Sequence, residues 1–144
     1  MNKKILIPIL ILAAWGLFKV GSQKYHYYMT IGENKEIAAI LSSYAAAENA
    51  YRGEYNRFTD DPAKLGYTVK PGKIKVYFSA QGLPARFYSV LTEESLPIFT
   101  DASYRILLAS ENTRTNRIDF WTVTQEKKPV QLKEFLMLDP LKVD

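Results

Sequence analysis

Cysteine is absent from this sequence, and histidine occurs once, at His26. The absence of cysteine excludes a disulfide framework, a thiolate zinc site and a cysteine nucleophile. Any triad or metal centre that needs an imidazole must use His26. The Gly-x-Ser-x-Gly, glycine-rich phosphate-loop, His-Glu-x-x-His and EF-hand patterns are also absent. We therefore expect that the chain is not an enzyme and has no catalytic residue, cofactor, metal site or small-molecule substrate.

Most of the surplus of basic charge lies in the first 19 residues, and the rest of the chain is nearly neutral. The formal net charge is +4, but three lysines lie before residue 20, which leaves 16 basic and 15 acidic residues in the rest of the chain. A nucleic-acid-binding protein concentrates a clear basic surplus on one face. The one short cluster, Lys70, Lys73 and Lys75, alternates with apolar residues and fits the solvated face of a strand. We expect no nucleic-acid partner.

The longest apolar run follows Lys3 and Lys4 and extends from Ile5 to Phe18. Residues 1–22 are therefore predicted to be a membrane anchor or a signal segment. As an anchor, this segment stays in the lipid bilayer, with the aromatic cluster Tyr25–Tyr28 at the water interface. As a signal, it is cleaved near Ser22. Both interpretations predict that residues 23–144 are exported.

Residues 23–144 are predicted to form a globular domain, and a helix is predicted at about residues 33–56 within it. Thr30 and Glu33 have capping-box spacing, which indicates a helix start. Apolar and tyrosine residues then recur at steps of three and four, which indicates one buried stripe. The members of the stripe are Ile37, Ile40, Leu41, Tyr44, Ala47, Tyr51 and Tyr55.

The polar sequence after this helix indicates a second helical start. A short polar residue precedes Pro62, which would be the first helical position, and Gly66 closes the turn. The adjacent carboxylates Asp60 and Asp61 resemble a catalytic acid pair. Carboxylates before a proline more often cap a helix and complement its dipole, so we interpret them as a cap.

Strand signals follow Gly66 and predict a sheet at about residues 73–124. The predicted strands are 73–78, 86–91, 104–109 and 118–124, with a hairpin loop at 111–116, an irregular excursion at 89–101, and a tail at 131–138 that forms an edge strand or a short helix. One helix followed by strands, without strand–helix alternation, predicts an α+β fold. In it, a long N-terminal helix, with a membrane-embedded first part and an amphipathic second part, packs on a small antiparallel sheet of about four strands.

Two segments resemble bacterial type IV pilins. Residues 45–67 read AAAENAYRGEYNRFTDDPAKLGY, and residues 118–128 read IDFWTVTQEKK. The first is similar to the pilin segment where the helix ends and leads to a Leu-Gly-aromatic step. The second is similar to the penultimate pilin strand. The resemblance implies a non-enzymatic pilin-like or minor-pilin-like structural or interaction protein, anchored by one span in the bacterial inner membrane with its globular domain on the periplasmic or extracellular side.

The same resemblance implies partners and an alternative. Pilin or pilus-assembly subunits would bind through the N-terminal helix. Alternatively, cleavage near Ser22 would release a secreted or periplasmic binding module with a pilin-like fold.

The first residues depart from the pilin pattern. Type IV prepilins have a short basic leader ending in glycine and a glutamate at the fifth mature position. Among residues 1–33, the only glycine before a bulky apolar residue is Gly16, the fifth position beyond it is Gly21, and the first acidic residue is Glu33. Lys3 and Lys4 lie where a mature pilin is apolar. We therefore expect a pilin-like chain that does not use the standard route into a pilus.

The remaining candidates for chemistry have structural interpretations. The Asn112–Asp119 loop corresponds to a loop that could hold a cation in similar pilins, but the charges of Arg114 and Arg117 oppose calcium binding. We interpret His26 as an interfacial residue among tyrosines rather than a proton switch. Met29 and Met137 are isolated.

Overall fold

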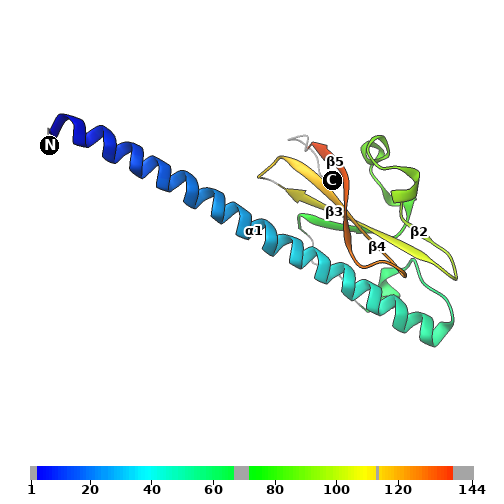
Figure 1. The fold of residues 1–144 in the computed structure, drawn as a ribbon. Helices are drawn as coiled ribbons and strands as arrows, with labels where there is room; N and C mark the ends of the chain where they lie inside the picture. The colour runs from blue at the N-terminus through cyan, green and yellow to red at the C-terminus, as the bar shows by residue number, and fades with distance from the viewer. Residues whose placement is uncertain (1–2, 67–71, 113, 138–144) are drawn as a thin grey trace. The chain divides into compact units, whose positions relative to one another are not determined.

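The computed structural model describes residues 3–66, 72–112 and 114–137, and it divides the chain into two compact units, Met1–Glu36 and Ile37–Asp144. Within the described residues, the chain forms one long helix, five strands and four short 3-10 helices (Figure 1). In chain order these are α1 (Lys3–Tyr55), η1 (Pro62–Leu65), β1 (Ile74–Tyr77), η2 (Ala80–Gly82), η3 (Ala85–Ser89), η4 (Glu93–Ser95), β2 (Ile98–Phe99), β3 (Tyr104–Asn112), β4 (Arg117–Thr124) and β5 (Val130–Met137).

The first unit contains the apolar part of α1. Its large apolar side chains are exposed from Ile7 to Met29, and the exposed fractions of Leu17 and Phe18 reach 76% and 77%. In the part of the chain that the structure describes, no helix is both long enough and apolar enough to cross a bilayer. The expectation of a single-pass inner-membrane anchor is therefore wrong. The run from Ile5 to Phe18 is about 21 Å long as a helix, against a hydrocarbon layer of about 30 Å.

The helix does not begin at the predicted capping box. Thr30 and Glu33 lie inside α1, and the Thr30 hydroxyl donates a hydrogen bond to the His26 carbonyl oxygen at 2.9 Å. A threonine hydroxyl inside a helix can bond to the carbonyl oxygen four residues earlier, so the Thr-x-x-Glu spacing alone does not identify a helix start. The predicted end is confirmed. Asn56, with a φ of 57°, terminates α1, and its amide donates to the Arg52 carbonyl oxygen at 2.8 Å.

The second unit is α+β, as predicted. The part of α1 that begins at Ile37 packs on an antiparallel sheet in the order β1-β3-β4-β5, and β2 also pairs with β3. The longest ladder joins β3 to β4, from Arg105 opposite Thr124 to Asn112 opposite Arg117. The sheet therefore extends beyond the predicted range 73–124, because β5 adds residues 130–137 at the edge.

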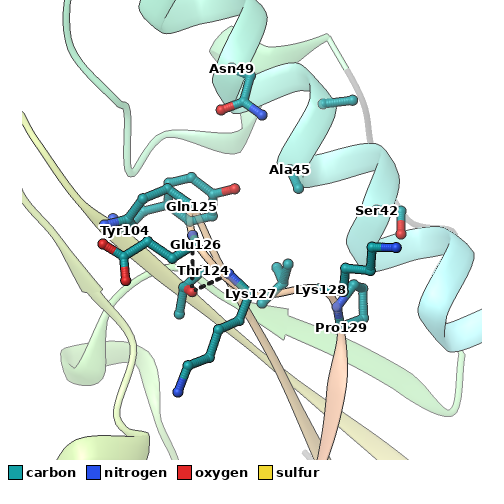
Figure 2. Close-up of a pocket in the computed structure, with 12 residues that line it drawn as sticks. Ser42, Ala45, Asn49, Tyr104, Thr124, Gln125, Glu126, Lys127, Lys128 and Pro129 are labelled. Carbon is teal, nitrogen blue, oxygen red and sulfur yellow. Dashed lines mark hydrogen bonds between the residues drawn. The ribbon is translucent and has the colours of Figure 1, made fainter.

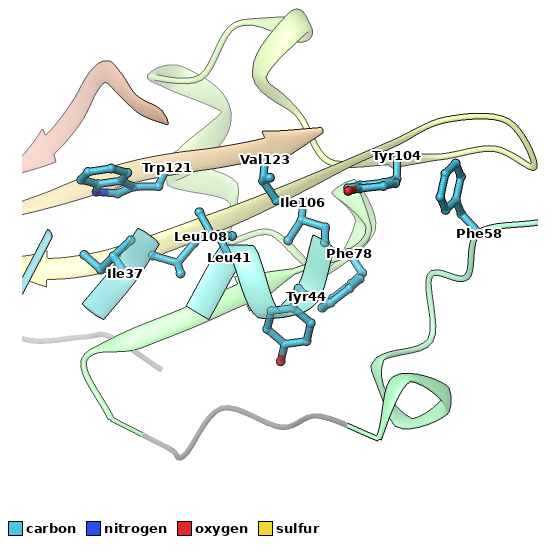
Figure 3. Close-up of a cluster of buried hydrophobic side chains, with 10 residues drawn as sticks. All are labelled: Ile37, Leu41, Tyr44, Phe58, Phe78, Tyr104, Ile106, Leu108, Trp121 and Val123. Carbon is cyan, nitrogen blue, oxygen red and sulfur yellow. The ribbon is translucent and has the colours of Figure 1, made fainter. Parts of the chain in front are cut away.

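One face of the sheet forms the main core with α1 (Figure 3). Side chains alternate between the two faces along β3, so that Tyr104, Ile106 and Leu108 point toward the helix. The Tyr44 ring packs edge-on against the Phe78 ring, with centroids 5.2 Å apart. The fully assembled cluster contains Ile37, Leu41, Tyr44, Phe58, Phe78, Tyr104, Ile106, Leu108, Trp121 and Val123.

The opposite face is covered by the segment between β1 and β2. The predicted strand 86–91 is wrong, because residues 85–89 form η3. Phe87 and Leu91 are buried while Tyr88 between them is exposed, which is the spacing of a helical turn rather than of a strand. The Phe87 ring meets the Phe120 ring edge-on at 5.0 Å. The irregular excursion at 89–101 is confirmed except for the short elements η4 and β2.

The β3–β4 hairpin turn differs from its predicted range, and the tail matches one of its two predicted forms. The hairpin turn is shorter than residues 111–116, since β3 continues to Asn112 and β4 begins at Arg117. The Asn112 side-chain oxygen accepts hydrogen bonds from the Arg114 and Thr115 amides, both at 3.2 Å. Of the two alternatives for the tail, the edge strand is confirmed up to residue 137 by its pairing with β4, and the short helix is wrong.

Candidate functional site

A buried glutamate interrupts the apolar stripe of α1 within the second unit. Glu48 lies four residues after Tyr44 and seven after Leu41, so the helical period places all three on the face that meets the sheet. Its exposed fraction is 0%. One carboxylate oxygen, Oε2, accepts a hydrogen bond from the Thr59 amide at 3.1 Å. The other oxygen, Oε1, has no hydrogen-bond partner within residues 3–66, 72–112 and 114–137.

The environment of Glu48 favours its protonated form. Burial raises the pKa of this carboxyl from 4.5 to about 7, since the charged form loses its hydration. The hydrogen bond from the Thr59 amide lowers the pKa, and the nearby charge of Asp60 raises it. Burial is the largest of these effects. The Glu48 carboxyl therefore changes charge near neutral pH.

Tyr104 is the second buried polar residue of this region. It begins β3, its exposed fraction is 2%, and its ring packs between Phe58 at 4.8 Å and Phe99 at 5.9 Å. Its hydroxyl also lacks a hydrogen-bond partner in the described part of the chain. Burial raises the pKa of Tyr104 to about 12, and the charge of Glu48 contributes to the rise. The hydroxyl is therefore a neutral donor at neutral pH.

Tyr104 also lines an open groove between α1 and the turn that joins β4 to β5 (Figure 2). The groove has a volume of about 350 Å³. Small helix residues, Ala45 and Ala46, form part of one wall, and the exposed charged residues Lys127 and Lys128 belong to the other. The remaining lining residues are Ser42, Asn49, Tyr104, Val123, Thr124, Gln125, Glu126 and Pro129.

Hydrogen bonds hold the groove's turn in place. The Thr124 hydroxyl oxygen accepts from the Glu126 amide at 3.3 Å and from the Lys127 amide at 3.1 Å, and Figure 2 shows these bonds as dashed lines. The Gln125 side-chain oxygen accepts from the Tyr104 amide at 3.0 Å. The turn thus connects the groove to the start of β3. The groove therefore presents hydrogen-bonding groups and the positive charges of Lys127 and Lys128.

Of the two carboxylates that precede Pro62, Asp61 has the predicted capping role and Asp60 does not. The Asp61 carboxylate accepts a hydrogen bond from the Ala63 amide at 3.0 Å and caps η1, with Pro62 at the first helical position. Gly66 ends the segment with a φ of 67°, a left-handed conformation that glycine adopts without strain. Asp60 is exposed and does not cap η1; instead its charge acts on Glu48.

The other sequence-derived candidates are not among the residues that line the groove. His26 lies on α1 in the first unit, and its ring is 6.0 Å from that of Tyr25. Met29 and Met137 are exposed. In β4, the Arg117 guanidinium lies over the Phe135 ring at 4.2 Å.

Neither the acidic groups nor the lysine cluster forms a larger site. Asp119 lies in β4 opposite Ser110. No group of three histidine, aspartate or glutamate residues gathers within the described ranges. Of the lysine cluster, Lys73 precedes β1, Lys75 is half-buried within β1, and Lys70 lies outside the described residues.

Comparisons with known proteins do not assign the chain to a family. No protein-family model, no curated protein and no solved structure matches this sequence. The fold is a long helix packed on an antiparallel sheet, which is a pilin-like architecture.

Sequence reasoning missed Glu48 and Tyr104. The signal for Glu48 was present, since a carboxylate stands between Tyr44 and Tyr51 in a stripe of otherwise apolar residues. No comparable signal marked Tyr104. Its position at the first residue of β3 is ordinary for a tyrosine, and only the fold brings it to Glu48.

Proposed function

We propose that this chain is a non-enzymatic, pilin-like structural protein that assembles with other subunits through the helix segment Ile7–Met29. The observation that carries the proposal is the exposure of large apolar side chains on this segment, which we call the apolar segment. Its exposed members are Ile7, Ile9, Leu10, Ile11, Leu12, Trp15, Leu17, Phe18, Val20, Tyr25, Tyr27, Tyr28 and Met29.

The energetics favour a partner for the apolar segment. Burying a leucine or phenylalanine side chain stabilises an assembly by about 1.5–3 kcal/mol, and contiguous exposed apolar surface marks interaction sites. The apolar residues occupy all sides of the helix rather than one stripe, so several neighbouring helices are needed to cover them. A bundle of helices from further copies or related subunits supplies such an environment.

The pilin-like character of the proposal draws on two supports. One is the architecture of the second unit, in which the helix from Ile37 onward packs on an antiparallel sheet. The other is the resemblance of residues 45–67 and 118–128 to pilin segments. Both concern the globular unit, whereas the exposed side chains concern assembly.

The proposal is tested by the oligomeric state of charge variants. Phe18→Glu places a charge in the apolar segment, and we expect it to reduce self-association at least about tenfold, because an unpaired charge is costly in an apolar interface. Ile98→Glu is the control, since Ile98 is also an exposed apolar residue, at 51%, but lies in β2. Sedimentation velocity of the full chain measures both. A monomeric wild type, or equal effects of the two variants, would contradict the proposal.

The groove favours a second candidate function, a binding module released by cleavage near Ser22. Every residue that lines the groove belongs to the unit Ile37–Asp144, so the groove remains after such a cleavage. Intact-mass measurement of the native protein distinguishes the two candidates. A mass equal to that of a chain beginning at Gln23 supports the released module. A mass that includes the apolar segment supports the assembling subunit.

A further inference from the structure

We propose that the protonation of Glu48 acts as a pH-sensitive latch, which holds residues 56–61 against α1 when the carboxyl is neutral and weakens their attachment when it is charged. The latch belongs to the unit Ile37–Asp144 and is independent of how the apolar segment assembles. We call residues 56–61 the latch loop.

The latch loop is attached by hydrogen bonds to α1 and by the Phe58 ring in the main core. The Asn56 amide donates to the Arg52 carbonyl oxygen, and the Thr59 amide donates to the buried carboxylate oxygen Glu48 Oε2 at 3.1 Å. The Phe58 ring packs beside the Tyr104 ring at 4.8 Å, and the Arg52 guanidinium lies over the Phe58 ring at 4.9 Å. Thr59 and Phe58 are both buried. Release of the loop therefore exposes Glu48 to water.

The carboxyl lacks the partners that would make its charge acceptable. Oε1 has no hydrogen-bond partner among the described residues, and no cationic side chain is among the groups that shift the pKa of Glu48. A buried charge without a partner is expensive, whereas the same charge in water is solvated. Deprotonation therefore costs free energy only while the latch loop is attached. The cost shifts the equilibrium toward the released loop.

The neighbouring titratable groups differ in their effect on the charge of Glu48. From the latch loop, the negative charge of Asp60 disfavours a second negative charge on Glu48. From β3, Tyr104 is neutral at neutral pH and supplies no positive charge. On α1, Arg52 lies against the Phe58 ring. The charged residues of the β4–β5 turn, Glu126 to Lys128, are exposed at the groove.

Release of the latch loop also alters the groove. Tyr104 lines the groove, and the Phe58 ring of the latch loop packs edge-on against it. Movement of Phe58 removes one of the two rings that fix the Tyr104 side chain, the other being Phe99. A change of pH near neutrality thus becomes a change in the shape of one groove wall.

Hydrogen exchange of the Thr59 amide tests the latch directly. The protection factor, which corrects for the intrinsic pH dependence of exchange, is measured in the full chain between pH 5 and pH 8. We expect the protection of Thr59 to fall on the order of 100-fold over this range in the wild type, because the Glu48 carboxyl has a pKa of about 7 while the loop is attached and of about 4.5 once it is solvated. In Glu48→Gln, which keeps the acceptor oxygen but cannot ionise, we expect protection to be independent of pH.

Two controls make the result decisive. Glu54→Gln removes an exposed carboxyl from the same helix and should retain the wild-type pH dependence. Trypsin cleavage after Arg57, an exposed residue of the latch loop, should accelerate with pH in the wild type relative to Glu48→Gln at each pH. Equal pH dependence in the wild type and Glu48→Gln would overturn the proposal.

A measurement on the wild type covers the case in which Glu48→Gln fails to fold. The carbon chemical shift of the Glu48 carboxyl, followed by NMR from pH 3 to pH 9, should titrate well above the range of an exposed glutamate, together with the amide shift of Thr59. Titration in the ordinary range of exposed glutamates, with the Thr59 amide still protected above neutral pH, would show that the charge does not release the loop.

Discussion

The two parts of α1 carry similar apolar residues with opposite surroundings. Before Glu36, the side chains of the apolar segment are exposed, as in Leu17 with an exposed fraction of 76%. From Ile37 onward, the apolar stripe lies against the sheet, and Leu41 has an exposed fraction of 0%. The difference teaches that an apolar sequence creates a requirement for a partner but does not supply one. Within one chain, only the second part of the helix meets that requirement.

The largest effect should separate two identical substitutions in the same helix. Leu41→Ala is expected to lower the free energy of unfolding by about 2–5 kcal/mol, because it removes a fully buried side chain from the core. Leu17→Ala should change it by less than about 0.5 kcal/mol in dilute solution, where the side chain contacts only water. Urea unfolding followed by Trp121 fluorescence measures both. Equal costs would show that the apolar segment is buried in the single chain.

The second effect concerns the acid that occupies the buried part of the helix. The folded-state pKa of Glu48, about 7, lies above its unfolded value of 4.5. The contribution of Glu48 to the free energy of unfolding is therefore full below pH 4.5, and it is lost as the pH rises to 7 and above. At about 1.4 kcal/mol per pKa unit, the loss is at most about 3.5 kcal/mol.

The comparison of wild type with Glu48→Gln isolates this contribution. The free energy of unfolding of the wild type should fall relative to that of the variant between pH 4.5 and pH 7. Denaturant titrations at a series of pH values measure the difference. A constant difference across this range would mean that Glu48 is solvated in the folded protein.

A smaller effect is expected where α1 has ended and the chain turns into η1. Asp61→Ala removes the side-chain acceptor of the Ala63 amide and should cost about 1 kcal/mol in unfolding free energy. The neighbouring change Asp60→Ala serves as the control at pH 5, where Glu48 is protonated and so is not repelled by the charge of Asp60. Its expected effect there is within about 0.5 kcal/mol, because the Asp60 carboxylate is exposed and does not cap η1. Thermal unfolding compares the two. Similar losses in both variants would contradict the capping role.

The smallest effect distinguishes a helix interior from a helix start in the first unit. The Thr30 hydroxyl bonds to the His26 carbonyl oxygen inside α1, so Thr30→Ala should raise helix stability by a few tenths of a kcal/mol, up to about 0.7. If Thr30 were instead an N-cap, the same change would cost about 1 kcal/mol. Far-ultraviolet circular dichroism during thermal unfolding reports the sign.

Much of the second unit could be predicted from local patterns. The β-branched and aromatic runs at 74–77, 104–112 and 117–124 form strands, and helix α1 ends beside Asn56, as the apolar periodicity indicated. The segment at 85–89 shows where such patterns fail. Its Arg-Phe-Tyr-Ser composition suits a strand, but the spacing of buried Phe87 and Leu91 follows from packing on the sheet, which no local pattern encodes.

The candidate site was less predictable than the fold. The sequence pattern correctly identified Asp61 as a cap, since the interaction with the Ala63 amide spans two residues. Glu48 and Thr59 are eleven residues apart, and Glu48 acts on Tyr104, which is fifty-six residues further along the chain. Contacts at such separations depend on how the helix is rotated against the sheet. The expected membrane anchor is contradicted within the described part of the chain, where no helix is long and apolar enough to cross a bilayer.

The amino-acid sequence by itself determined the helical part, the strand-forming runs, the turn chemistry at Pro62 and Gly66, and the absence of thiol chemistry, because each depends on neighbours within a few residues. The tertiary structure alone decided which side chains are buried. Leu17 and Leu41 have the same chemistry, and Glu48 is the more polar residue, yet Leu41 and Glu48 are buried while Leu17 is exposed. Burial, and with it the pKa of Glu48, depends on what packs against a residue, and that partner is distant in the sequence.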